Sequence, residues 1–240
     1  MKKAFTLIEL VLVIVVVGVL STMVSPNFQR NGLQEAANQL VSHIRYTQHL
    51  AMMDNKFDSN KGTWFKERWQ IIFARSVNGE TTWSYTIFSD SSNRDKNPNH
   101  TREIARDPLN AGSLNLSGHL TEGQYLSGGY AGVLPLNDKR VNKNMILGQK
   151  NGVKWISFSR SCSHQKPPAK NQSRRVMFDN IGRPYWNYKK DAISIASNPY
   201  TNMNLVRNQC VITLCDEVKC IGGEKVKIAI EPETGYTHIL

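Results

Sequence analysis

A long apolar run opens the chain. Residues 5–24 are apolar except at five positions, which are Thr6, Glu9, Gly18, Ser21 and Thr22. At 1.5 Å per residue, a helix of this length spans about 30 Å, the thickness of the hydrocarbon layer of a bilayer. The polar break at 21–26 is a poor match to the small-residue pattern of a cleaved secretory signal. Because Lys2 and Lys3 precede the run, it predicts a membrane-spanning helix with residues 27–240 on the non-cytoplasmic side.

The helical pattern continues beyond Pro26 with a different character. Apolar and small side chains recur three or four positions apart, as on one face of an α-helix, at Leu33, Ala36, Ala37, Leu40, Ile44, Thr47 and Ala51. The opposite face is polar and carries Gln34, Glu35, Asn38, Gln39, Ser42, Arg45 and Gln48. Together the two segments predict a helix from Phe5 to about Met53, near 70 Å long, whose second half packs on a globular domain.

Strand-like alternation replaces the helical period in the rest of the chain. Residues 69–75 and 82–88 alternate and are joined across Asn78-Gly79, a strong β-hairpin signal. Further strands are predicted at 153–158, 175–178, 183–188, 211–214, 225–230 and 235–239. The pattern therefore predicts an α+β fold, in which a long N-terminal helix packs on an antiparallel β-sheet head over residues 55–240.

The segment at about 90–150 departs from this alternation. It is rich in Asn, Ser, Gly and Asp and contains Pro98, Pro108 and Pro135. Such a composition predicts a loop or an elaborated insertion rather than core. Four leucines within it could form a short strand or two, and these are Leu114, Leu116, Leu120 and Leu126.

The first ten residues carry a specific motif. Lys2-Lys3-Ala4-Phe5-Thr6-Leu7-Ile8-Glu9-Leu10 resembles the processing site of type IV pilins and type II secretion pseudopilins. The resemblance implies that a prepilin peptidase removes the leader 1–4 between Ala4 and Phe5, and that Phe5 is then N-methylated. Ala4 stands where the family usually has glycine. The resemblance further implies an assembly helix over 5–25, a helix bend at Pro26 and an amphipathic half over 26–54.

The lone glutamate in the apolar run acquires a role through this resemblance. An unpaired carboxylate in the outer part of a membrane-spanning stretch costs roughly 2.5 kcal/mol or more. In the pilin family, the corresponding glutamate meets the cleaved terminal amine of a neighbouring subunit. Glu9 is therefore expected to pair with the Phe5 amine of the next subunit and to fix axial register. The alternative is that Glu9 lies near the interface and extends toward water.

Three segments of the head resemble the GspH/FimT group of minor pilins and pseudopilins. They are 152–158, 176–183 and 227–236, which follow the order of strands and glycine turns in that group. The resemblance implies a structural subunit of a type IV pilus tip or a type II secretion pseudopilus. It would sit in the bacterial inner membrane as a single-pass protein with a periplasmic head, until an inner-membrane assembly platform extracts it to join other pilins.

Four cysteines, Cys162, Cys210, Cys215 and Cys220, lie in the part predicted to be translocated. Oxidation is favoured there, and an even count allows two disulfides in three connectivities. We expect Cys215–Cys220 to close a turn and Cys162–Cys210 to tie neighbouring strands. A zinc site with His164 as a further ligand is the competing interpretation, although the chain has no Cys-x2-Cys knuckle.

Motifs for catalysis are missing from the sequence. It has no Gly-x-Ser-x-Gly, no Gly-x4-Gly-Lys and no His-Glu-x2-His, and its six histidines form no cluster along the chain. His43 and His49 are six residues apart on the predicted helix and do not share a face. We therefore expect no enzymatic activity, no cofactor and no metal.

Positive charge is concentrated in one segment. Residues 139–190 contain thirteen Lys and Arg against one acidic residue, while the whole chain carries a net charge of +11. Aromatic residues accompany them, as on nucleic-acid surfaces. The candidate DNA surface consists of Lys139, Arg140, Lys143, Lys150, Lys154, Arg160, Arg174, Arg175, Arg183, Lys189 and Lys190.

DNA uptake is the alternative function that this segment suggests, since some FimT-like minor pilins serve in it. The DNA-binding members of the family resemble one another in a C-terminal Gly-Arg-x-Arg loop, whereas the corresponding place here reads Gly235-Tyr236-Thr237-His238. The competing interpretation is that the basic residues form a solvated face or complement acidic neighbours, with the aromatic residues in the core.

Overall fold

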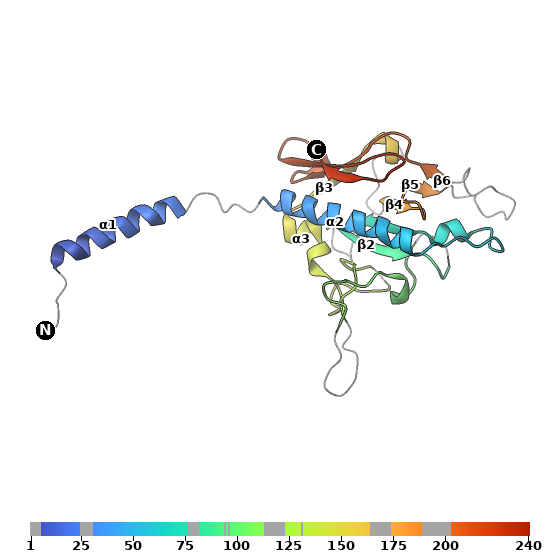
Figure 1. Ribbon diagram of the computed structural model, residues 1–240, viewed down its shortest axis with the longest axis horizontal. Coiled ribbons are helices and arrows are strands. Elements are labelled where there is room, and N and C mark those ends of the chain that lie inside the picture. Colours follow the sequence, from blue (N-terminus) through green and yellow to red (C-terminus); the bar gives the residue numbers. More distant parts are fainter. Residues whose placement is uncertain are drawn as a thin grey trace, which may run out of the picture. The chain divides into compact units, whose positions relative to one another are not determined.

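The structure is a computed structural model that describes residues 6–24, 31–75, 82–93, 95, 97–112, 123–130, 132–163, 174–188 and 203–240 (Figure 1). The chain divides into two units, residues 1–31 and residues 32–240. The first unit contains helix α1, Leu7–Val24. Several predicted features lie outside the described residues, namely Ala4, Phe5, the bend at Pro26, the turn at Asn78-Gly79, and Leu114, Leu116 and Leu120.

Helix α2, Gly32–Met53, is the scaffold of the second unit and ends at the predicted residue. All seven positions of the predicted inner face are buried, and Val41 is buried beside them. Ala36 and Ala37 have no exposed surface, so the helix backbone lies close to the strands beneath it. Each fully buried Leu or Ile on this face contributes roughly 1.5–3 kcal/mol to stability.

Among the described residues, nine strands form two antiparallel sheets, which confirms the predicted α+β class. The first sheet has the order β2-β1-β4-β5-β6 and contains β1 Trp69–Ala74, β2 Ser84–Ser89, β4 Arg174–Phe178, β5 Pro184–Tyr188 and β6 Met203–Leu205. The second has the order β3-β7-β8-β9 and contains β3 Trp155–Phe158, β7 Cys210–Cys215, β8 Lys225–Ile230 and β9 Thr237–Ile239. Figure 1 shows α2 lying across both sheets.

Short helices complete the described structure. Helix α3 spans Leu147–Asn151. Single 3-10 turns occur at Trp64–Glu67, Thr101–Glu103, Lys143–Met145, Arg160–Cys162 and Val218–Cys220. The sequence pattern did not predict α3 or the three-residue strand β6, because neither is long enough to show a period.

The first sheet buries both of its faces. In β1, Ile71 and Phe73 belong to the core beneath α2, whereas the intervening Ile72 belongs to a second core on the opposite face. In β2, Ile87 and Phe88 divide in the same way. A strand covered on both sides needs apolar residues at consecutive positions, so the run around Ile71 is continuous rather than alternating.

The segment at 90–150 supplies this second core, so the prediction that it lies outside the core is wrong. It contributes five residues to the cluster around Ile72 and Phe88, namely Ile104, Tyr125, Leu134, Val141 and Ile146. Its backbone is bonded to β2, since Ala105 N donates to Ile87 O at 2.9 Å and Gly128 N donates to Tyr85 O at 3.0 Å. The apolar residues fall in short stretches without a sustained helical or strand period, so only tertiary contacts reveal that they are buried.

Strand β7 carries a disulfide at each end. Cys210 is bonded to Cys162, and Cys215 is bonded to Cys220. This is the pairing that the spacing of the cysteines favours. The competing zinc interpretation is wrong, because all four sulfur atoms are bonded to each other in pairs and none is free to ligate a metal as a thiolate.

A half-buried polar cluster connects α2 to β2. Gln39 Nε2 donates to Tyr85 Oη at 2.7 Å and to Asn144 O at 3.1 Å. His43 Nδ1 lies 2.8 Å from the same hydroxyl. Burial lowers the pKa of His43, with a smaller opposing effect from Asp107, and burial raises the pKa of Tyr85. The neutral imidazole is therefore the form that the fold stabilises.

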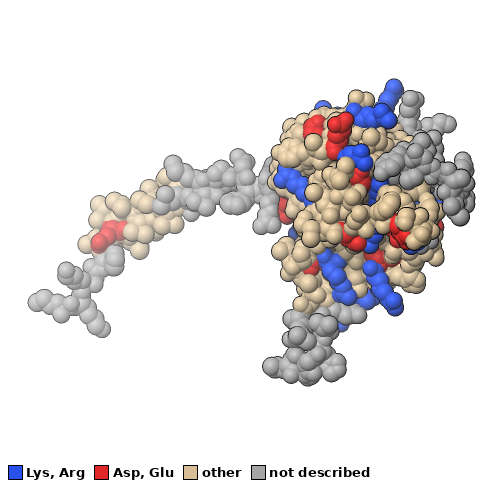
Figure 2. Space-filling model, turned by 45° about the vertical axis from the view of Figure 1, so that its right-hand side comes forward, with Lys and Arg blue, Asp and Glu red and all other residues tan. Residues whose placement is uncertain are grey.

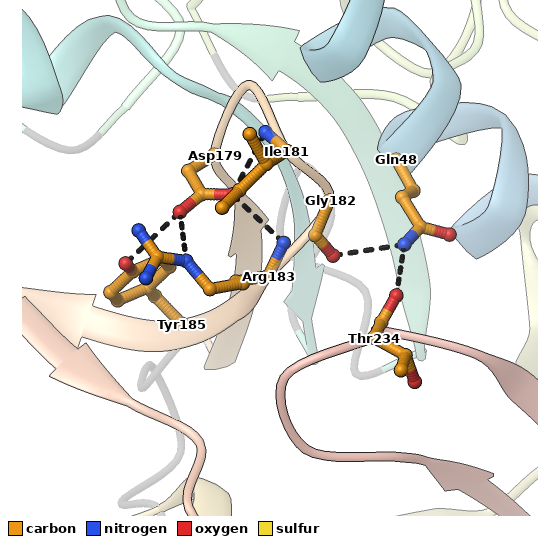
Figure 3. A network of polar contacts seen from close by, with 7 residues as sticks. All are labelled: Gln48, Asp179, Ile181, Gly182, Arg183, Tyr185 and Thr234. Atoms are coloured by element: carbon orange, nitrogen blue, oxygen red, sulfur yellow. Dashed lines mark hydrogen bonds and ion pairs between the residues drawn. The ribbon is translucent and has the colours of Figure 1, made fainter.

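Two tight turns meet at Gln48. Its Nε2 donates to Gly182 O at 2.9 Å in the β4–β5 turn and to Thr234 O at 2.7 Å in the β8–β9 turn (Figure 3). Gly235 has φ +66° at this junction. A Cβ atom on Gly235 would lie 2.6 Å from Gln48 Nε2 and would overlap the carbonyl oxygen of Gly182.

We expect Gly235→Ala to lower the free energy of unfolding by about 3 kcal/mol, through backbone strain and steric overlap together. Gly152→Ala is the matched control, because Gly152 has φ +70° and no atom within 4 Å of the added Cβ. It should cost only the strain, about 1 kcal/mol. Urea denaturation of the full chain in detergent measures both values, and equal losses would contradict the packing at Gln48.

The pKa of His43 predicts a pH dependence. The unfolded histidine takes up a proton below about pH 6.5, whereas the folded one resists it because its pKa is lowered. The free energy of unfolding should therefore be fully maintained above pH 6.5 and fall below it, by at most about 1.4 kcal/mol per pH unit from this residue. His43→Gln should flatten this slope in urea titrations, and an unchanged slope would contradict the assignment.

Candidate functional site

Helix α1 begins with a local polar contact between Thr6 and Glu9. The Thr6 carbonyl accepts hydrogen bonds from Glu9 N at 3.1 Å and from Leu10 N at 3.2 Å. Thr6 Oγ1 donates to Glu9 Oε2 at 3.4 Å. Glu9 thus lies in the first turn, where a carboxylate interacts favourably with the positive end of the helix dipole. The weak contact engages one carboxylate oxygen and leaves capacity for a cation.

The remainder of α1 presents apolar side chains in every direction. From Leu7 to Val19 every residue is exposed, including Leu7 at 82% and Ile14 at 61%. A helix that is apolar all round requires an apolar environment from outside its own unit. Glu9 is the acidic residue on this surface. Its carboxylate would therefore become buried in an apolar surrounding when another molecule covers this side of α1.

The length and apolar character of the described helices bear on the predicted membrane-spanning segment. None of the helices in the described ranges combines the length and the apolar character that crossing a bilayer requires.

The residues of the candidate DNA surface differ in their surroundings. Lys189 and Lys190 lie outside them. Three others form ion pairs, which are Arg140–Asp138 at 2.7 Å, Arg183–Asp179 at 2.7 Å and Lys154–Glu217 at 3.2 Å. Four are exposed without an ion pair to a described acidic residue, and these are Lys139, Lys143, Lys150 and Arg160. On the face drawn in Figure 2, Lys and Arg are interspersed with Asp and Glu.

Two arginines of this set act inside the fold. Arg175 is buried and its Nη1 donates to Gln70 Oε1 at 2.9 Å. The guanidinium of Arg174 lies 5.6 Å from the centre of the Phe158 ring, and burial lowers the pKa of Arg174. Both side chains therefore make stabilising contacts within the head.

Four of the accompanying aromatic residues offer no exposed ring for stacking. Trp155, Phe158, Phe178 and Tyr185 are all buried, with exposed fractions of 8% or less. Base stacking requires an exposed ring face. The structure therefore favours the interpretation in which the aromatic residues of this segment belong to the core.

Asp179 stabilises the β4–β5 turn, a role that the sequence analysis did not predict. Its Oδ1 accepts from Ile181 N at 3.1 Å and Arg183 N at 2.8 Å, and its Oδ2 accepts from Arg183 Nε at 2.7 Å and Tyr185 Oη at 3.1 Å (Figure 3). An aspartate after a strand and a glycine three residues later is a turn signal that could have located it. No comparable pattern singled out Gln48, because a glutamine on the polar face of a helix is expected to contact solvent.

The family comparison bears on the N-terminal segment. A family model described as a prokaryotic N-terminal methylation motif matches residues 1–25. The chain carries this methylation motif. The match supports a type IV pilin-like prepilin and implies processing by a prepilin peptidase, a methylated N-terminus and assembly with other pilins. No curated protein and no solved structure matches the chain.

The methylation motif and the geometry of α1 concern the same residues. The motif includes Thr6 and Glu9, which the structure joins by a hydrogen bond, and the apolar helix that follows them. The spacing Thr-x-x-Glu is also a helix-start signal, and it could have identified Thr6 as the partner of Glu9 from sequence. Helix α1 is therefore the candidate functional surface of the first unit.

Several basic side chains of the candidate DNA surface are ion-paired or buried, and four of the accompanying aromatic rings are buried. We therefore predict weak DNA binding. We expect the full chain in detergent to give no mobility shift with duplex or single-stranded DNA at about 150 mM salt. A chain with both Tyr236→Arg and His238→Arg, which restores the arginines of the loop described above, is the positive control. Retardation of the unaltered chain at this salt concentration and at micromolar protein would contradict the prediction.

Proposed function

We propose that the protein is a structural minor pilin or pseudopilin of the GspH/FimT type. A prepilin peptidase cuts between Ala4 and Phe5, Phe5 is methylated, and the chain joins a type IV pilus tip or a type II secretion pseudopilus. The observation that carries the proposal is the methylation motif over residues 1–25, together with an α1 that is apolar on all sides and bears one carboxylate.

Electrostatics gives the Glu9 carboxylate its role in this proposal. Cleavage creates a positive amine on Phe5, and a buried amine or a buried carboxylate alone is costly in an apolar surrounding. Pairing Glu9 of one subunit with the Phe5 amine of the next removes both penalties. A slip of one residue along the helix axis leaves both charges unpaired, so the pair selects a single register.

The head is consistent with a periplasmic location. Two disulfides form and persist in an oxidising compartment, and both lie in the second unit. In our proposal α1 holds the subunit at the inner membrane before assembly, and the assembly platform then moves it into the fibre. The pilin-like family is structural rather than catalytic. The work of the subunit is to polymerise and to present its head.

A place at the tip or in a short fibre follows from the size of the head. The segment at 90–150 adds a second layer on the outer face of the first sheet. In a long, tightly packed fibre this layer would be repeated in every subunit and would crowd its neighbours. We therefore propose a minor subunit rather than a major pilin. A deletion strain can be tested in parallel for secretion, twitching motility and transformation. The activity that is lost shows whether the subunit serves a type II secretion system, a type IV pilus or DNA uptake.

Processing and assembly can be tested separately. With an active prepilin peptidase, mass spectrometry should find a methylated Phe5 terminus, and Met1 still attached would refute the proposal. Glu9→Leu should leave processing intact but reduce the subunit in sheared fibres about tenfold or more, because the neighbour's amine loses its partner. Glu35→Leu is the control, since Glu35 occupies the first turn of α2 and should enter fibres normally.

A further inference from the structure

Three large apolar side chains are exposed along one side of α2. Met52 is 52% exposed, Ile181 is 61% exposed and Tyr236 is 56% exposed. They come from three separate segments, which are the end of α2, the β4–β5 turn and the β8–β9 turn. We call Met52, Ile181 and Tyr236, with Arg45 and Gln48 between them, the α2 ridge.

Contacts to α2 hold the three segments together. Arg45, Gln48 and Met52 are three and four residues apart and so lie on one face of the helix. The guanidinium of Arg45 lies 5.3 Å from the centre of the Tyr236 ring. A Cβ atom on Gly182, next to Ile181, would lie 3.4 Å from Met52 Sδ. Gln48 bridges the two turns from between these positions (Figure 3).

The backbone that presents the ridge is fixed by hydrogen bonds. The four bonds to Asp179 set the turn that carries Ile181, and one of them comes from Ile181 N itself. At the other end, Arg45 Nε and Nη2 both donate to Thr237 O, at 2.9 and 2.6 Å. A preorganised surface loses little conformational entropy when a partner docks on it. Exposed apolar groups on such a backbone mark an interaction surface.

The small size of the ridge restricts its occupant. Three side chains bury a few hundred Å² at most, well below the roughly 1,200 Å² of a stable stand-alone interface. The occupant must therefore be held beside the head by another contact. Helix α1, exposed and apolar on all sides, supplies such a contact between chains that carry the methylation motif.

We propose that the α2 ridge is the docking surface for the head of a neighbouring pilin-like subunit. This inference rests on the proposed function, because α1 must first place the two subunits side by side. The partner presents an apolar patch that covers Ile181 and Met52, with an acidic or carbonyl group toward Arg45. The ridge then sets the rotation of one head against the next, while Glu9 sets the axial position.

The chain offers a matched control for Ile181. Both Ile181 and Leu109 follow an aspartate by two residues, and each backbone N–H donates to that aspartate, at 3.1 Å to Asp179 Oδ1 and 2.9 Å to Asp107 Oδ1. Both side chains are exposed, Leu109 to 95%. Ile181→Glu and Leu109→Glu therefore make the same chemical change in the same kind of turn, on and off the ridge.

The experiment uses the full chain expressed with an active prepilin peptidase and its assembly machine. Ile181→Glu should lower the amount of the subunit in sheared fibres roughly tenfold, because a charge replaces a buried apolar contact. Leu109→Glu should leave it unchanged. Equal incorporation of the two variants would overturn the proposal.

A photo-crosslinking residue placed at position 181 gives a second readout that does not depend on the effect of Glu. The expected adduct joins the ridge to the head of a chain with a methylated N-terminus, identified by mass spectrometry. Adducts only within the same chain, with lipid or with DNA would overturn the proposal. If incorporation into fibres still depends on Glu9 but no such adduct forms, the docking role of the α2 ridge is refuted while the proposed function is retained.

Discussion

The close contact between α2 and the two sheets is the constraint on which the head depends. Ala36 and Ala37 are fully buried where the helix meets the strands, and Leu40 and Ile44 continue the same face. Because these side chains are small at one end and branched at the other, the helix can lie across strands from both sheets at once. Every other feature of the head is placed relative to this helix.

Much of this arrangement is predictable from local sequence. The buried face of α2 follows from its period, and the pairing of β1 with β2 follows from two strand-like segments on either side of a turn signal. The second core is not predictable in this way. Ile104 and Leu134 lie in short stretches without a sustained period, and their burial depends on strand β2, which is distant in the sequence. Patterns of short range carry no information about such contacts.

Charge was the least reliable guide to the surface. Arginine is counted as a cation in a sequence, but its guanidinium also stacks on rings and donates inside the protein. Within residues 139–190, Arg174 lies over Phe158 and Arg140 lies over Tyr125. The apparent concentration of charge is therefore in part a set of structural side chains. By contrast, the N-terminal motif was recognisable because processing and assembly act on a short linear segment.

The two disulfides on β7 have a mechanical consequence. The bond between Cys162 and Cys210 is a covalent shortcut across 48 residues, and that between Cys215 and Cys220 is one across five. Tension transmitted along the backbone passes through these sulfur atoms and bypasses the chain between them. About 170 Å of contour length is thereby withheld from extension. A subunit pulled from its helix can lengthen only outside these closed loops, so the segments that carry β3 and β7 stay covalently joined near Cys162 and Cys210 under load.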